Sequence, residues 1–138
     1  MSGQRVMRSS RGLTGAVALG GLLLGVPAHG HHSFAAYYHE DQEVVVDGVI
    51  TEVQFRAPHA WVHVATIDAS GRAIQVAAEW SNPSRLERDG ISRDTLQVDD
   101  RVRIWGSPSR NPDNRMHLKR IARSRDGFQW TGGRRRTR

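Results

Sequence analysis

Residues 73–90 read AIQVAAEWSNPSRLERDG, and the change of pattern within this stretch decides the fold. Up to Trp80 the apolar residues alternate with polar or small ones, which is the period of a half-buried strand. The next residues predict one short helix, because Asn82 is a favourable N-cap, Pro83 suits the first helical position and Gly90 follows the last turn. A strand therefore passes directly into a helix of about two turns.

Predicted strands flank this junction on both sides. Three precede the helix and two follow it, at Val44 to Phe55, His59 to Ile67, Ala73 to Trp80, Arg101 to Gly106 and Met116 to Ser124. This order of elements is that of the OB-fold, a small five-stranded Greek-key barrel. We therefore predict an all-β, OB-like barrel with one short helix over residues 44–130, in which Gly48 marks a bulge or bend and Phe128 and Trp130 extend or cover the last edge. A β-sandwich fragment or a plain meander is the alternative.

The first 30 residues predict an export signal. Three arginines precede the apolar run from Leu13 to Val26, which is too short and too interrupted by glycine to span a bilayer, and small residues follow it. Cleavage is expected after Ala28 or after Gly30, and the absence of an adjacent arginine pair before the run favours the general secretory route. The processed chain is then periplasmic or secreted, without a transmembrane span. An uncleaved membrane anchor is the alternative.

The positive charge of the chain is concentrated at its two ends. The formal net charge is +6, and removal of the three signal arginines lowers it to +3. Four further arginines lie in the tail at residues 131–138, which is predicted to be basic and disordered, so the body from His29 to Gly133 carries only −1. A nucleic-acid-binding domain carries its basic residues on the folded body, so no specific nucleic-acid binding is expected.

Cysteine is absent, which excludes disulfides, thiolate nucleophiles and thiolate metal sites. The sequence also contains no G-x-S-x-G, phosphate-loop or H-E-x-x-H motif, so we predict no catalytic residue and no organic cofactor. We therefore predict that the protein is not an enzyme, and a copper-dependent oxidase or monooxygenase is the least favoured function.

Cleavage of the predicted signal would create a histidine-bearing N terminus. After a cut at Gly30, the α-amine and the imidazole of His31 form a bidentate chelate, and further imidazoles could complete a nitrogen set suited to Cu(II). Those imidazoles belong to His32, His39, His59 and His63. After a cut at Ala28, the sequence His29-Gly30-His31 would instead bind copper or nickel through the amine, two backbone amides and the His31 ring.

The predicted metal ligands are four histidines, His31, His32, His59 and His63. A set of nitrogen donors without thiolates favours Cu(II), and Ni(II) or Zn(II) are also suitable. Strand alternation puts His59 and His63 on one face together with Trp61. The aromatic residues Phe34, Tyr37 and Tyr38 suggest that the N-terminal segment, residues 31–43, packs onto the barrel and brings its histidines to a fixed place.

Structural roles for the same histidines are the alternative. The first two could be a solvated chain end. His59 could bond the backbone at a strand entry, and its stripe with the neighbouring rings could be a half-exposed sheet face. In the last predicted strand, Met116 and His117 point to opposite faces and are not expected to act together.

Several motifs resemble a family of small exported bacterial proteins that is catalogued as a domain of unknown function. The motifs are HHSFAA at residues 31–36, VDGVITEV at 46–53, APHAW at 57–61 and SNP at 81–83. Members of that family open with HHSFA after the signal and carry an N-P-H-A-W-like turn. The resemblance covers His31 to about Ile121 and implies an exported OB-like barrel, without supplying an activity.

This chain departs from the family pattern at two places. Ala57 stands where asparagine is usual, and His29-Gly30 precedes the double histidine. If the family pattern holds, cleavage after Gly30 is implied and His31 becomes the first residue.

Two functions follow from these patterns. The first is a periplasmic protein that binds or handles a divalent metal through its processed N terminus and its barrel histidines. The second is a non-catalytic OB-like module that binds an unknown periplasmic protein or small ligand and in which the histidines are incidental.

Overall fold

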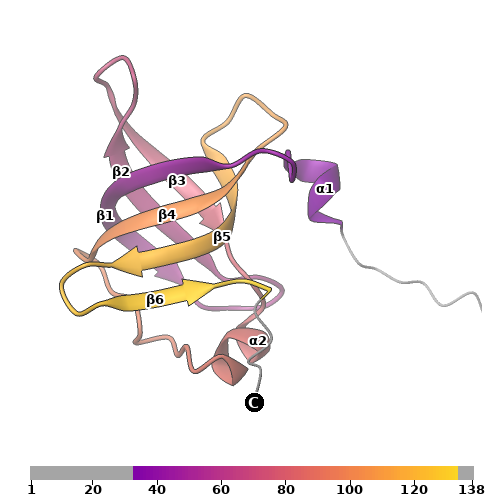
Figure 1. Cartoon of the computed structure of the whole chain (residues 1–138), viewed down its shortest axis with the longest axis vertical. Helices are drawn as coiled ribbons and strands as arrows, with labels where there is room; N and C mark the ends of the chain where they lie inside the picture. Colours follow the sequence, from indigo (N-terminus) through magenta and orange to yellow (C-terminus); the bar gives the residue numbers. More distant parts are fainter. Residues whose placement is uncertain (1–32, 134–138) are drawn as a thin grey trace, which may run out of the picture. The chain divides into compact units, whose positions relative to one another are not determined.

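The computed structural model describes residues 33–133. The predicted signal peptide with its cleavage site, His31 and His32, and the end of the arginine-rich tail lie outside the described residues. The described part consists of six strands and two short helices (Figure 1). The strands are β1 (Val44–Gln54), β2 (Trp61–Ile67), β3 (Ala73–Glu79), β4 (Arg101–Pro108), β5 (Arg115–Arg123) and β6 (Phe128–Thr131), and the helices are α1 (Phe34–Tyr37) and α2 (Pro83–Arg88).

The first five strands close into a barrel. The sheet order is β3-β2-β1-β4-β5-β6, all neighbours in it are antiparallel, and β3 also pairs in parallel with β5. This last pairing joins the two sides of the sheet, and β6 adds an extra strand beside β5 (Figure 1). The structure confirms the predicted OB-like barrel, with the helix between the third and fourth strands.

The strand–helix junction forms as its residues predict. The Asn82 side chain accepts a hydrogen bond from the backbone N–H of Arg85 at 2.9 Å, which caps α2. Gly90 follows the helix with a φ of 84°, a left-handed conformation that glycine adopts without strain. Leu86, on the inner face of the helix, is fully buried in the barrel core. Burial of this one leucine therefore ties α2 to the barrel.

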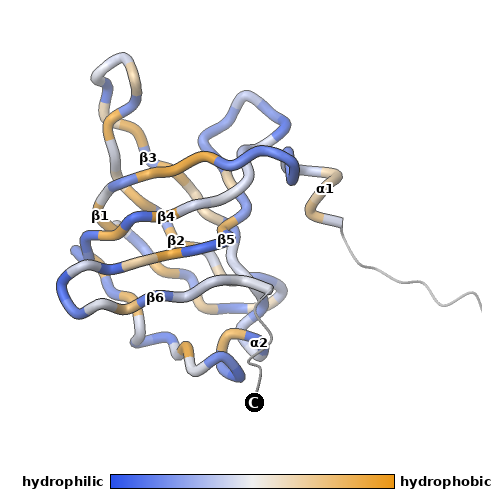
Figure 2. The backbone as a smooth tube through the Cα atoms, in the orientation of Figure 1, coloured by the Kyte–Doolittle hydropathy of each residue, from blue (hydrophilic) through white to orange (hydrophobic). Residues whose placement is uncertain are grey.

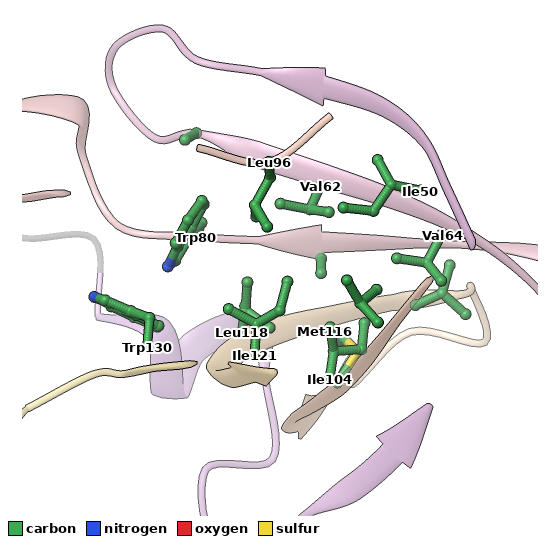
Figure 3. Packing of buried hydrophobic residues seen from close by; sticks show 14 of the residues in the cluster. Ile50, Val62, Val64, Trp80, Leu96, Ile104, Met116, Leu118, Ile121 and Trp130 are labelled. Carbon is green, nitrogen blue, oxygen red and sulfur yellow. The ribbon is translucent and has the colours of Figure 1, made fainter. Parts of the chain in front are cut away.

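The core forms from the inward-facing residues of the strands. Figure 3 shows the central aliphatic side chains, which come from β1, β2, β4 and β5 and include Ile50, Val62, Val64, Ile104, Leu118 and Ile121. At one side Trp80 and Trp130 pack edge to face, with ring centroids 5.3 Å apart and planes at 82°. The indole nitrogen of Trp80 is buried without a hydrogen-bond acceptor, and it lies on the side of its ring that faces Trp130 (Figure 3).

Hydropathy along the backbone follows this arrangement. Hydrophobic stretches lie along the strands, whereas the loop between β4 and β5 is hydrophilic (Figure 2). In β5, Met116 is buried and His117 is only partly so, as alternation predicts.

Two local expectations need correction. Gly48 is not at the bulge of β1, because the register with β2 shifts between Ile50 and Glu52. Gly48 is instead required for close packing, since a Cβ atom there would lie 2.2 Å from the carbonyl oxygen of Ala65. The second predicted strand begins two residues late, at Trp61, so His59 lies in the connection before β2.

Candidate functional site

The N-terminal segment of the described chain is held against the barrel. Tyr38 is 3% exposed and forms an isolated antiparallel bridge with Ser109, just beyond β4. The backbone N–H of His39 donates to the carbonyl of Pro108 at 2.9 Å, and that of Arg110 donates to the carbonyl of Tyr37 at 2.9 Å. The predicted packing of this segment is confirmed for its described part, and a single helical turn, α1, was not expected.

Phe34 brings two histidines of the barrel into one cluster. Its ring stacks on the imidazole of His117 with centroids 3.7 Å apart and planes at 1°. The same ring lies 5.2 Å from the imidazole of His59, with planes at 29°. His59 precedes β2 and His117 lies in β5, so the first turn of the described chain links two separate parts of the barrel.

Glu79, the last residue of β3, holds His59 in place. Its Oε1 lies 2.6 Å from Nδ1 of His59, and its Oε2 accepts a hydrogen bond from the Tyr38 hydroxyl at 2.5 Å. Burial, and then the hydrogen bond and charge of Glu79, raise the pKa of Tyr38 far above its usual value, so its hydroxyl stays a donor. A carboxylate acceptor beside both groups fits the tautomer of His59 that carries its proton on Nδ1.

Glu40 forms the corresponding contact with His117. Nδ1 of His117 lies 2.9 Å from Oε1 of Glu40, and the ammonium of Lys119 donates to the Glu40 carbonyl at 3.0 Å. The parallel pairing of β3 with β5 sets Glu79 opposite His117. Four side chains, His59, Glu79, His117 and Glu40, therefore gather around Phe34. We call them, with Phe34, the imidazole cluster.

The cluster has the form of two imidazole–carboxylate pairs. In each pair Nδ1 contacts a carboxylate, and within the described residues neither Nε2 atom forms a hydrogen bond. The side chains of His59 and His117 are 27% and 20% exposed, so neither is sealed in the core. A histidine whose Nδ1–H is held by a carboxylate presents the lone pair of Nε2, which is how many metal-binding histidines are oriented.

The predicted ligands fall in different places. His59 lies in the cluster, whereas the imidazole of His63 contacts the side-chain amide of Gln54, with a nitrogen–nitrogen distance of 3.4 Å. His31 and His32 are outside the described residues. Within residues 33–133 no group of three or more acidic or histidine side chains is arranged to hold a metal ion, so the cluster needs further donors to form such a site.

The sequence did not place three members of the cluster in a common site. Glu40 gave no signal beyond being acidic, Glu79 stood out only as a carboxylate borne by a strand, and His117 was not expected to act with Met116 because the two point to opposite faces. Strand alternation could have placed His117 outside the barrel, but only the β3–β5 pairing brings it to Glu79.

Comparison with known proteins assigns the chain to a family. The model of a family described as a family of unknown function (DUF6152) matches residues 21–118. No curated protein and no solved structure matches the chain significantly. In the described range, neither helix is long and apolar enough to cross a membrane.

Proposed function

The chain belongs to the DUF6152 family, a family of unknown function, and we propose that it is an exported protein that binds a divalent transition metal ion, with Cu(II) favoured. In this proposal the metal is held by the α-amine and histidine side chains of the processed N terminus together with the Nε2 atom of His59. Export, cleavage and metal binding are all part of the proposal.

The stacking of Phe34 on His59 is the observation that carries it. His31 and His32 precede Phe34 by three and two residues. Because one residue spans at most about 3.6 Å, covalent connection alone keeps their backbone within about 11 Å of Phe34. The nitrogen donors of a processed N terminus are thus tethered close to an imidazole that already has its Nδ1 bound to Glu79.

The donor chemistry supports Cu(II). Imidazole and amine nitrogens suit divalent copper, and the chain has no cysteine to favour a softer ion. His117 is a second imidazole of the same type, since its Nδ1 is held by Glu40 at 2.9 Å. We include His117 as a further candidate ligand. His63 stays a sequence-based prediction, and we rank it behind His59 because it contacts Gln54 rather than the N-terminal segment.

The N terminus is tested by comparing two forms of the mature protein. One begins at the residue found by mass spectrometry of the exported chain, and the other carries one extra residue in front of it. Titration with Cu(II), followed by electron paramagnetic resonance and a competing chelator, should show much weaker binding to the extended form. Equal binding by both forms, or no binding by either, would contradict an amine-based site.

The barrel ligand is tested by single substitutions in the authentic mature chain. We expect His59→Ala to change the ligand field and weaken Cu(II) binding, and His63→Ala to leave both close to wild type. Circular dichroism shows whether each variant keeps the fold. A His59→Ala variant that is folded and has an unchanged copper spectrum would remove His59 from the site. Copper would then be bound by the N-terminal donors alone, a chelate that does not require the folded barrel.

A further inference from the structure

A pocket of about 550 Å³ opens beside the imidazole cluster. Phe34 and His117 line one part of it, and the rest is formed by α2, β5, β6, the residues that follow β6, and Glu43 and Ser81 from the connections before β1 and α2. Among its described lining residues three are basic and one is acidic: Arg85, Lys119 and Arg120 against Glu43. The pocket therefore carries an excess of positive charge, independently of any metal.

The basic residues are not equally neutralised. Lys119 lies 3.7 Å from a carboxylate oxygen of Glu40. Arg120 reaches Glu43 only at 4.0 Å, and its guanidinium lies over the ring of Trp105, 4.0 Å from the centroid. Arg85 is exposed and its guanidinium forms no ion pair within residues 33–133. Arg85 is therefore the cation best able to accept a charged group from solution.

The rest of the pocket is apolar or offers uncharged polar groups. Trp130 lines it and is 8% exposed, and its packing against Trp80 holds its ring rigid. The Trp130 indole N–H is held by Asp89 at 3.1 Å, which fixes the plane of its ring. Ser81 and Thr131 contribute hydroxyl groups. A rigid aromatic ring beside one cation that is unpaired within the described residues suits a ligand with a flat apolar part and one anionic group.

We propose that this pocket binds a small organic anion, whose carboxylate faces Arg85 and whose apolar body lies against Trp130. The arrangement combines charge complementarity with burial of apolar surface, the two features that small-molecule sites share. This inference is separate from the metal proposal, because Arg85 and Trp130, which carry it, are not proposed metal ligands, although the candidate ligand His117 lines another part of the pocket. The test is therefore made on metal-free protein.

The experiment is a benzoate titration of the metal-free mature chain, followed by the indole N–H signals in a nitrogen–proton correlation spectrum. The chain has four tryptophans, and we expect a saturable shift of the Trp130 signal, with the Trp61 signal as internal reference. Benzyl alcohol, which is similar in shape but neutral, should produce a much smaller shift. Arg85→Ala should weaken benzoate binding about fivefold, the effect of losing one partly exposed charge contact.

Arg88→Ala is the matched control. Arg88 lies in the last turn of α2, as Arg85 does, but does not line the pocket. We expect it to change benzoate affinity less than about twofold. Equal weakening by both arginine variants would show a general cationic surface and overturn the proposal. Equal binding of benzyl alcohol, or no saturable shift of Trp130, would overturn it as well.

Discussion

The ring of Phe34 lies parallel to the imidazole of His117, with an interplanar angle of 1° and a centroid distance of 3.7 Å. Phe34 is only partly buried, so its contribution comes from this stacking and from its contact with His59 rather than from core packing. It is therefore a residue of the N-terminal segment whose ring contacts both histidines directly.

Phe34→Ala should release this segment from the barrel. We expect a loss of about 1 to 2 kcal/mol in the free energy of unfolding, because a stacked, partly buried aromatic ring is removed. Hydrogen exchange of the His39 amide, which donates to Pro108 at 2.9 Å, should become faster. Phe34→Tyr keeps the ring and serves as the control. Unchanged exchange in the alanine variant would mean that the bridge at Tyr38 holds the segment by itself.

Glu79→Gln tests the role of the carboxylate behind His59. Glutamine keeps the size of the side chain but removes the charge that holds Nδ1 of His59 at 2.6 Å. If His59 is a metal ligand, we expect Cu(II) affinity to fall about tenfold, the usual effect of losing the group that orients a ligating histidine. The measurement is a chelator-competition titration.

Glu87→Gln is the matched control for this substitution. Glu87 is exposed on α2 and its side chain forms no hydrogen bond or ion pair with the cluster residues, so its change to glutamine should leave copper affinity at the wild-type value. Should both variants bind copper as the wild type does, His59 does not act through an Nε2 atom oriented by Glu79.

Much of the fold is predictable because its signals are local. Alternation in β1 to β5 depends on neighbouring residues only, and the Asn82 cap and Gly90 stop depend on the chemistry of single positions. The start of β2 is less predictable, because His59 and Ala60 continue the alternation although regular pairing with β1 begins only at Trp61.

The site is less predictable because it depends on pairing between distant strands. Aromatic residues near the N terminus indicated that the segment packs onto the barrel, and Tyr38 does so. Glu79 and His117 lie opposite each other because of the closing pair β3–β5, whose register is not encoded in either strand alone. Alternation predicts that His63 and His59 share a face, but it does not predict their partners. His63 contacts Gln54, whereas His59 contacts Glu79.

Gly48→Ala should be strongly destabilising. A Cβ atom at this position would lie 2.2 Å from the Ala65 carbonyl oxygen and 2.5 Å from Cγ1 of Val64, so the backbones of β1 and β2 would have to separate. We expect a loss of about 2 to 3 kcal/mol in urea unfolding. Gly71→Ala is the comparison: its φ is 82° with nothing within 4 Å, so only backbone strain of about 1 kcal/mol is expected. Equal losses would mean that β1 and β2 can move apart freely.

Asp100→Asn should destabilise the barrel in a pH-dependent way. Asp100 is 3% exposed and forms ion pairs with the buried Arg123 and, at 3.1 Å, with Arg125. Burial alone would raise the pKa of Asp100, but the backbone N–H of Gln97 and the two arginines outweigh it and hold the pKa below its usual value. The charged form is therefore favoured by the folded state.

The sign of the pH effect follows from this lowered pKa. Asp100 contributes its full stabilisation above the unfolded-state pKa of about 4, and the contribution is lost as the pH falls through the lower folded-state value. At neutral pH, Asp100→Asn should cost about 3 kcal/mol, because it leaves the buried Arg123 with one charged partner fewer.

Urea unfolding at neutral pH and near pH 3 should show that the difference in unfolding free energy between wild type and variant becomes smaller in acid. The surface pair of Asp47 with Arg103 offers the control, since Asp47→Asn should cost far less at either pH. A difference for Asp100→Asn that stays constant would mean that its side chain stabilises the barrel through hydrogen bonds rather than through charge.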